Sequence, residues 1–161
     1  MREPHVPPHP DMPGPTPAKP PALIHEPGHL MRRAHQLAVS VFHDTHGRHV
    51  TPVQYAILRA LEASPGIDQS TLAQRVALDT STTADIATRL EAKGWIVREM
   101  LPRRQRRLSL TAEGEAVLRD MLPRVLPMYR QLLSPLEVAE QQELLRLLNK
   151  LLQIDGTSGQ G

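Results

Sequence analysis

The sequence predicts a mainly α-helical fold with one small β-hairpin, and three observations indicate that class. Aromatic residues make up only 2% of the chain, while Leu, Ala and Val supply most of its apolar side chains, which favours helices over an all-β fold. Apolar residues recur at helical spacing in several segments. Two short apolar runs, at 95–97 and 108–110, bracket a basic stretch that contains Pro102, as in a hairpin.

The length of 161 residues fits one folded domain with an extension, and we expect the domain at residues 28–155. Residues 1–27 contain ten prolines, so we expect a disordered Pro-rich arm there and a disordered tail at 156–161. The chain has no cysteine, which excludes disulfides and thiolate metal sites. No apolar stretch approaches the roughly 20 residues that span a bilayer, and no signal peptide is evident, so we expect a cytoplasmic protein without membrane contact.

The first two helices are expected at about 28–46, ending at Gly47, and from residue 52 onwards. Thr51-Pro52-Val53-Gln54 is a capping box with proline at the first helical position, so the start of the second helix is clear. The buried positions expected on the first helix are Leu30, Ala34, Leu37, Ala38, Val41 and Phe42. Those expected on the second are Val53, Ala56, Ile57, Ala60 and Leu61.

Two short helices joined by a tight turn are expected next. Asp68 caps the first of them, and after a break around 78–80 either Thr80 or Ser81 caps the second. Their inward positions are Leu72 and Val76 on the first, and Ile86, Ala87 and Leu90 on the second. Such a pair is the skeleton of a helix-turn-helix.

Two further helices are expected after the hairpin. Thr111 is a good N-cap for the first of them. Pro123 and Pro127 each remove a backbone hydrogen bond and should kink or break that helix. Ser134-Pro135-Leu136-Glu137 predicts the start of the last helix. The apolar positions of the last helix are Leu144, Leu145, Leu148, Leu151 and Leu152.

The hairpin is the most basic part of the chain. Residues 66–111 carry eight Lys or Arg against five Asp or Glu, a balance of +3, while residues 1–65 and 112–161 carry +1 and −2. Guanidinium groups on a projecting turn suit phosphates or a narrow minor groove. The alternative is an exposed basic loop that only keeps the protein solvated. The arginines concerned are Arg103, Arg104, Arg106 and Arg107.

The second short helix carries the candidate residues for reading DNA. Its exposed polar positions are expected to be Ser81, Thr82, Thr83, Asp85 and Arg89, and Ser70 on the preceding helix is a further candidate. Short hydroxyls can bind phosphates or base edges, and an aspartate can accept from cytosine. The structural alternatives are helix caps for the hydroxyls and an i, i+4 ion pair between Asp85 and Arg89.

Catalytic and metal motifs are scarce. The sequence has no Gly-rich phosphate loop, nucleophile elbow or zinc-protease helix, so we expect neither an enzyme nor a cofactor. His43, His46 and His49 are spaced three apart beside Asp44, which is compatible with zinc. We favour a helix-end cluster without metal, because the chain offers no cysteine and the helix after the hairpin has no histidine to complete a site.

Four phrases of the sequence are distinctive in combination. They are Val50-Thr51-Pro52-Val53-Gln54-Tyr55, Asp68-Gln69-Ser70-Thr71-Leu72-Ala73, Arg89-Leu90-Glu91-Ala92-Lys93-Gly94 and Leu108-Ser109-Leu110-Thr111-Ala112-Glu113-Gly114. Over about residues 28–153 the chain resembles the MarR family of bacterial repressors. The resemblance implies a winged helix-turn-helix at about 51–111. It also implies a homodimer, joined by helices at about 28–46 and 112–155, that grips a palindromic operator in double-stranded DNA.

The resemblance also singles out the tip of the hairpin, the wing. The family's wing usually carries an Asp followed by one or two arginines, and these arginines fall on Arg103 and Arg104, with Pro102 at the Asp position. That Asp would orient an arginine by a charge-assisted hydrogen bond. Which arginine enters the minor groove therefore stays open, and Arg104 is the first choice.

Members of the family are typically released from DNA by small aromatic acids or phenols, which bind between the dimerisation helices and the DNA-binding lobe. The candidate ligand-binding residues are Arg33, His35, His43, Tyr55 and Tyr129, with surface charges and core tyrosines as the alternative. The stretches 30–38 and 51–55 are similar to the branch that represses nicotinate-degradation genes, so a hydroxynicotinate-like effector is expected. The competing hypothesis is a metal- or ligand-binding interaction module, for example a zinc-responsive regulator that uses the three histidines.

Overall fold

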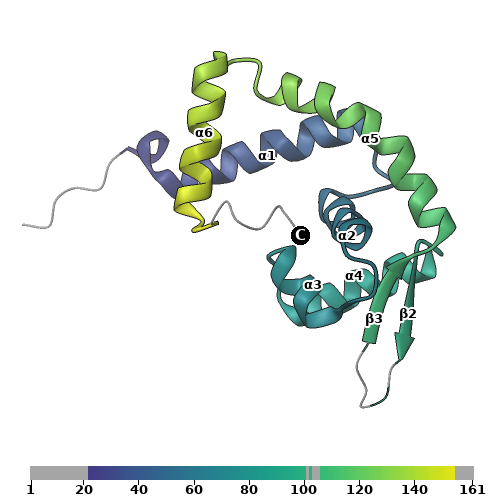
Figure 1. Ribbon diagram of the computed structural model, residues 1–161. Helices are drawn as coiled ribbons and strands as arrows, with labels where there is room; N and C mark the ends of the chain where they lie inside the picture. The colour runs from purple at the N-terminus through teal and green to yellow at the C-terminus, as the bar shows by residue number, and fades with distance from the viewer. Residues whose placement is uncertain (1–21, 101, 103–105, 155–161) are drawn as a thin grey trace, which may run out of the picture. The chain divides into compact units, whose positions relative to one another are not determined.

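The computed structural model describes residues 22–100, 102 and 106–154, and it divides into two compact units, Met1–Ala34 and His35–Gly161 (Figure 1). Most of the expected arm, the expected tail and two wing arginines, Arg103 and Arg104, lie outside the described residues. In the first unit the 3-10 helix η1 (Leu23–His25) precedes the start of α1 (Pro27–His46). The rest of α1 belongs to the second unit.

The second unit holds the elements on which the predicted functions depend. They are α2 (Pro52–Ala63), β1 (Ile67–Asp68), α3 (Gln69–Arg75), α4 (Thr80–Ala92), β2 (Ile96–Met100), β3 (Arg106–Leu110), α5 (Ala112–Leu132) and α6 (Val138–Leu151). The expected class, mainly helical with a small hairpin, is confirmed. Within the described ranges, no helix is both long and apolar enough to cross a membrane.

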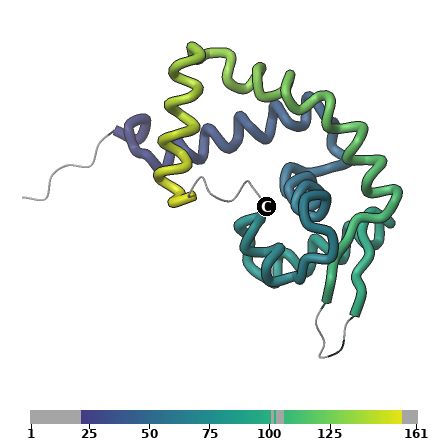
Figure 2. The backbone as a smooth tube through the Cα atoms, in the orientation of Figure 1, coloured from purple at the N-terminus to yellow at the C-terminus, as the bar shows by residue number. Residues whose placement is uncertain are grey.

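The hairpin is part of a three-stranded antiparallel sheet with the strand order β1-β3-β2. Ile96 pairs with Leu110 at one end of the hairpin and Met100 with Arg106 at the other, so β2 and β3 run side by side toward the tip (Figure 2). The strand β1 was not predicted, because two residues are too few to show a period. Its Ile67 pairs with Leu108.

The helix starts follow hydrogen-bonding side chains, with two corrections. The capping box of α2 is confirmed, since Gln54 N donates to Thr51 Oγ1 and Thr51 N donates to Gln54 Oε1, both at 3.2 Å. The predicted caps of α4 are wrong, because Asp79 is the N-cap and its carboxylate accepts from Thr82 N at 2.8 Å. The predicted start of α6 is also wrong. Ser134 closes α5 by donating to the Gln131 carbonyl, and Glu137 caps α6.

The helix α5 continues through both of its prolines, so of the two expected outcomes, a kink or a break, the break does not occur. Pro123 and Pro127 are both exposed, which places the lost backbone bonds on the side where water can reach the carbonyls. At its start, α5 lies against the base of the hairpin. A Cβ built on Gly114 would lie 1.9 Å from the Trp95 carbonyl oxygen, so only glycine fits at this position.

The second unit contains two hydrophobic clusters. The first joins α2, α3, α4, the sheet and the start of α5, and the second joins the end of α1 to α5. Leu58 is fully buried although it was not predicted, while Val53, predicted to be buried, is 37% exposed. The reason is that α2 is packed by α3, β3 and α5, which cover more than one side of it.

Burial on α1 differs from the expectation. Val41 and Phe42 are buried as predicted, but Leu30 and Leu37 are 48% and 53% exposed. The second cluster gathers only on the last turns of α1, so the apolar positions before them stay uncovered in a single chain.

Candidate nucleic-acid interface

The two helices of the helix-turn-helix begin in the same way. Each follows an aspartate whose carboxylate accepts hydrogen bonds from nearby backbone and hydroxyl groups. Asp68 accepts from the backbone and hydroxyl groups of Ser70 and Thr71, at 2.5 to 3.1 Å. Asp79 accepts from Thr82 N and Oγ1 and from Ser81 Oγ, at 2.6 to 2.9 Å. The structure therefore brings Ser70, Ser81 and Thr82 to exposed or half-exposed positions at helix starts.

These hydrogen bonds hold both caps in the ionised form. The hydroxyls of Ser70 and Thr71 keep the pKa of Asp68 far below its ordinary value. The hydroxyl and backbone N–H of Thr82 lower the pKa of Asp79 from 3.8 to about 2. The hydroxyl protons of Ser70, Ser81 and Thr82 are thus already donated, and these oxygens keep only acceptor capacity unless they exchange partners.

The outer face of α4 contains most of the predicted contact residues, with one exception. Ser81, Asp85 and Arg89 are exposed, but Thr83 is completely buried and its hydroxyl donates to the Asp79 carbonyl. The expectation that Thr83 is exposed is wrong, because Thr83 lies four and seven residues before the buried Ala87 and Leu90 and shares their inward face. No ion pair joins Asp85 to Arg89 in the described part of the chain, so the structural alternative to DNA contact for these two residues is absent.

Thr88 is an exposed polar residue of α4 that the sequence analysis did not single out. It lies three residues after Asp85 and seven after Ser81, which puts the three on one helix face. That spacing was visible in the sequence. The Thr88 hydroxyl donates to the Ala84 carbonyl at 2.9 Å.

The described part of the wing presents two of the four predicted arginines. Arg106 and Arg107 are exposed on β3, opposite Met100 and Glu99 of β2. The wing is fixed to α4 by an ion pair in which Arg98 donates to Glu91, with Nε at 2.8 Å from Oε2. The same contact lowers the pKa of Glu91. Because Glu91 lies near the end of α4, this pair holds the wing in position beside the recognition helix.

The candidate ligand-binding residues have different local surroundings. Arg33 lies in the first unit, and His35 is exposed in the second. The ring of His43 is hydrogen-bonded to the Gly47 carbonyl, with Nδ1 at 3.0 Å. Tyr55 is half-buried, and burial, followed by the nearby Tyr129, raises its pKa.

An aromatic cluster surrounds Tyr55, and His46 is its unexpected member. Phe42 lies 4.8 Å from His46 and 5.8 Å from Tyr55 between ring centroids, and the His46 and Tyr55 rings stack at 6.3 Å. His46 is 2% exposed, and neither of its ring nitrogens has a hydrogen-bond partner. Burial, with a smaller effect of Arg124, lowers its pKa, so the imidazole is neutral.

The three histidines do not assemble a metal site. His46 is buried among aromatic rings, while His49 is exposed and His43 is bonded to the end of α1. Among the described residues, no group of three or more His, Cys, Asp or Glu could hold a metal ion. The zinc-responsive alternative therefore has no support in the geometry.

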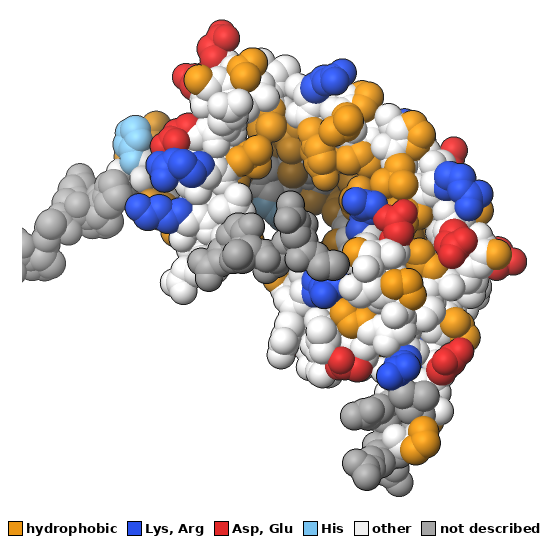
Figure 3. Space-filling view, viewed as in Figure 1, with side chains coloured by type: hydrophobic (Ala, Val, Ile, Leu, Met, Phe, Trp, Pro, Cys, Tyr) orange, Lys and Arg blue, Asp and Glu red, His pale blue; other side chains and the backbone are white. Residues whose placement is uncertain are grey.

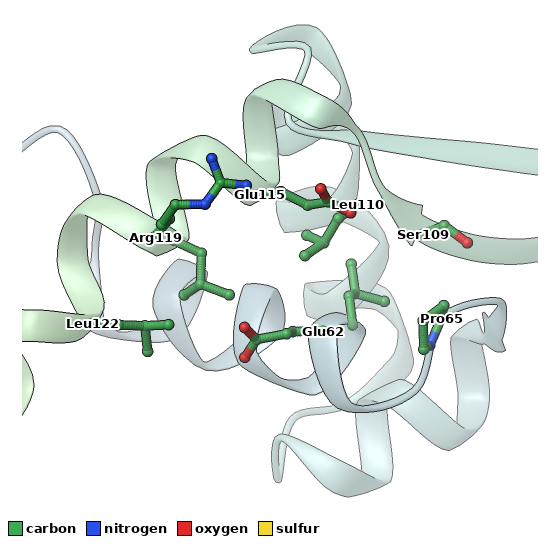
Figure 4. A pocket seen from close by; sticks show the side chains of 9 residues that line it. Glu62, Pro65, Ser109, Leu110, Glu115, Arg119 and Leu122 are labelled. Atoms are coloured by element: carbon green, nitrogen blue, oxygen red, sulfur yellow. The ribbon is translucent and has the colours of Figure 1, made fainter.

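A cavity of about 320 Å³ lies between α2, β3 and α5 (Figure 4), and no residue of the aromatic cluster lines it. Leu61 and Leu118 form part of its apolar lining, and Glu62, Glu115 and Arg119 are the charged residues around it. None of the predicted ligand-binding residues lines this cavity.

A capped helix pair with a polar outer face, followed by a hairpin with exposed arginines, defines a winged helix-turn-helix DNA-binding protein. The MarR family model matches residues 50–108. The homoprotocatechuate degradative operon repressor of Escherichia coli is 32% identical over 125 residues, which are 76% of this chain and 84% of that protein. The chain belongs to the MarR family, and it is a transcriptional regulator of that family.

Two solved structures are similar along most of their length. The PcaV regulator of Streptomyces coelicolor, in complex with its natural ligand, has a TM-score of 0.78 and 35% identity, covering 84% of this chain and 98% of that one. BpsR of Bordetella bronchiseptica, whose DNA binding is regulated by 6-hydroxynicotinic acid, has a TM-score of 0.78 and 26% identity, covering 84% and 99%. The relatives are thus regulators rather than enzymes.

Proposed function

We propose that this regulator is a homodimeric repressor that binds a palindromic operator and leaves it when a small aromatic acid binds. The recognition helices enter successive major grooves, about 34 to 36 Å apart, and the wings enter the flanking minor grooves. The observation that carries this proposal is the exposed polar face of α4, held beside an arginine-bearing wing by the pair of Arg98 and Glu91.

The proposed DNA contacts fall into two groups. Arg106 and Arg107, together with Arg103 and Arg104, supply phosphate and minor-groove contacts, which are tolerant of sequence. The contacts from α4 and the start of α3 supply specificity. These residues are Ser70, Ser81, Thr82, Asp85 and Arg89. Thr83 is left out of the proposal because it is buried.

The proposal of a homodimer is supported by the apolar surface of α5 and α6. No residue of α6 is buried, and its Leu145, Leu148 and Leu151 are 53%, 40% and 56% exposed. Leu126 of α5 is 65% exposed, and hydrophobic side chains gather over α5 on the face that Figure 3 shows. Apolar surface on this scale is normally covered by a partner, and a second copy of the chain is the partner that the family favours.

DNA binding is tested by fluorescence anisotropy with the duplex from upstream of the regulator's own gene. The wild type should bind specifically at physiological salt, and Arg107→Ala should weaken binding to specific and random duplexes alike. Arg107→Ala should also flatten the dependence of log K on log salt by about one unit. Arg59→Ala is the matched control, because Arg59 pairs with Glu62 within α2, outside the proposed contacts. Absence of a specific complex with the wild type would refute the proposal that this protein is a repressor.

The proposed effector is an aromatic acid of the hydroxynicotinate kind, bound near the aromatic cluster of Phe42, His46 and Tyr55. The unpartnered nitrogens of His46 and the exposed ring of Tyr129 offer polar and aromatic contacts, and His43, His35 and Arg33 are the further candidates. Titration with 6-hydroxynicotinate should raise the melting temperature of the wild type by mass action. Tyr55→Ala should remove that rise, while Tyr55→Phe separates loss of the hydroxyl from loss of the ring. An unchanged melting temperature in the wild type contradicts this ligand.

A further inference from the structure

Lys93 ends α4, and its ammonium group joins segments that are far apart in the sequence. Nζ donates to the His49 carbonyl at 2.7 Å, in the loop between α1 and α2. It also donates to Gln54 Oε1, at 3.4 Å, in the first turn of α2. Nζ lies 4.2 Å from the centroid of the Trp95 ring, just before β2. An ammonium carries three donors and one full charge, so a single group can hold all three partners.

Each partner of Lys93 lies at a junction between elements. His49 belongs to the loop of residues 47–51, which connects the end of α1 to α2. Gln54 Oε1 already accepts from Thr51 N at 3.2 Å, in the capping box of α2. The Trp95 carbonyl accepts from Thr111 N at 3.0 Å, where β3 passes into α5. Lys93 ends α4 and contacts Trp95 at the base of the wing. A shift of the loop of residues 47–51 would therefore disturb Lys93 and its contacts with both.

Another contact also joins the wing to the end of α4. Arg98 of β2 donates to Glu91 of α4, only two residues before Lys93. Lys93 is exposed, so its side chain is not held in place by burial. Its polar partners hold it instead. A cation at the C-terminal end of a helix is also favoured by the helix dipole. Lys93 thus links the α1–α2 loop to α4 and the wing, which the Arg98–Glu91 ion pair already joins to each other.

We propose that Lys93 is a positioning residue for DNA binding, coupling the α1–α2 loop to the recognition helix and the wing. The inference rests on the proposed DNA-binding function. His46, in the aromatic cluster, is the last residue of α1. A conformational change in that cluster is transmitted first to the loop of residues 47–51. Lys93 then transmits it from the loop to α4 and the wing. By reciprocity, DNA bound to α4 and the wing steadies the loop.

The test compares hydrogen exchange of residues 47–51 with and without the upstream duplex. In the wild type the duplex should slow exchange there, although the loop is not a proposed DNA contact. Lys93→Met keeps the length of the side chain without its charge, and it should reduce that slowing at least fivefold and weaken duplex affinity by about fivefold to tenfold. Lys93→Arg keeps a cation with several donors and should restore most of both effects. Arg59→Met removes a charge elsewhere and should behave like the wild type.

The outcomes separate this inference from the proposed function. Full duplex-dependent slowing in Lys93→Met, or an equal loss in Lys93→Arg and Lys93→Met, overturns the role of Lys93. If the wild type binds no duplex, the repressor proposal fails and the Lys93 link is still tested without DNA. Lys93→Met should then exchange at least fivefold faster than Arg59→Met at residues 47–51, and equal exchange overturns the link.

Discussion

Leucine has opposite surroundings in two regions of this protein. In the DNA-binding lobe of α2, α3, α4 and the sheet, Leu61, Leu72 and Leu90 are completely buried. On α6, Leu145 and Leu151 are 53% and 56% exposed. The lobe completes a core within one chain, whereas α6 presents its apolar residues to whatever lies outside the chain. The difference teaches that one chain is enough to cover the leucines of the lobe, whereas the apolar face of α6 is open to the association that we propose.

The largest expected effect is the loss of a core leucine from the lobe. Leu61→Ala should lower the free energy of unfolding by about 2 to 5 kcal/mol, because it removes buried methyl groups and leaves a cavity. Urea denaturation followed by circular dichroism measures the change. In dilute protein, Leu145→Ala should change the stability by less than about 0.5 kcal/mol. Equal losses in the two variants would erase the contrast between the regions.

The next effect concerns association through α6. Leu145→Glu puts a carboxylate on the apolar face, and burying it at an interface is costly. We expect the dimer dissociation constant to rise at least about tenfold, which corresponds to about 1.4 kcal/mol. Sedimentation velocity over a range of concentrations measures it. A Leu145→Glu protein that dimerises as tightly as the wild type would place the interface elsewhere.

A smaller effect is expected where the lobe meets α5. Thr111 Oγ1 donates to the Gly94 carbonyl at 2.5 Å and accepts from Gly114 N at 3.1 Å, so it caps α5 and holds the base of the wing. Thr111→Ala should lower the free energy of unfolding by about 1 kcal/mol. Thr88→Ala, in which an exposed threonine is lost from α4, is the matched control and should stay within about 0.5 kcal/mol. Thermal unfolding of both variants shows whether Thr111 at this junction contributes more to the free energy of unfolding than the exposed Thr88 does.

The smallest effect is a pH dependence that comes from the cluster around His46. Burial holds the pKa of folded His46 below its ordinary value of 6.5, so the unfolded chain takes up the proton first. The contribution of neutral His46 to stability is complete above pH 6.5 and is lost as the pH falls toward the lower folded pKa. His46→Phe should flatten the pH dependence of the free energy of unfolding below pH 6.5, measured by urea midpoints. A profile identical to that of the wild type contradicts this role.

Much of the fold was predictable because local chemistry sets it. The capping box at Thr51, the cap at Asp68 and the cap at Thr111 could be predicted from a few neighbouring residues, and all three are present. The start of α4 was misplaced because aspartate, threonine and serine in succession all make good caps. Asp79 is the cap, and its carboxylate accepts from the hydroxyl of Ser81, one of the two predicted caps, and from that of Thr82.

The surroundings of the candidate site residues could be predicted only in part. Ser70, Ser81, Asp85 and Arg89 lie at the surface as expected, since helical spacing alone separates the faces of α3 and α4. Thr83 has the same residue type as its neighbour Thr82 but turns inward. The place of His46 among Phe42 and Tyr55 depends on the packing of α1 against α2, which no local pattern encodes.

The sequence by itself determined the order of helices, the hairpin, the surface position of Arg106 and Arg107 and the family, because caps, periodicity and short phrases act over a few residues. Only the tertiary structure decided which leucines are covered, that α5 continues through its prolines, and that Lys93 contacts His49, Gln54 and Trp95. The physical reason is that burial and long-range hydrogen bonds depend on which elements pack together. That packing is a property of the whole lobe and cannot be assigned to any one segment.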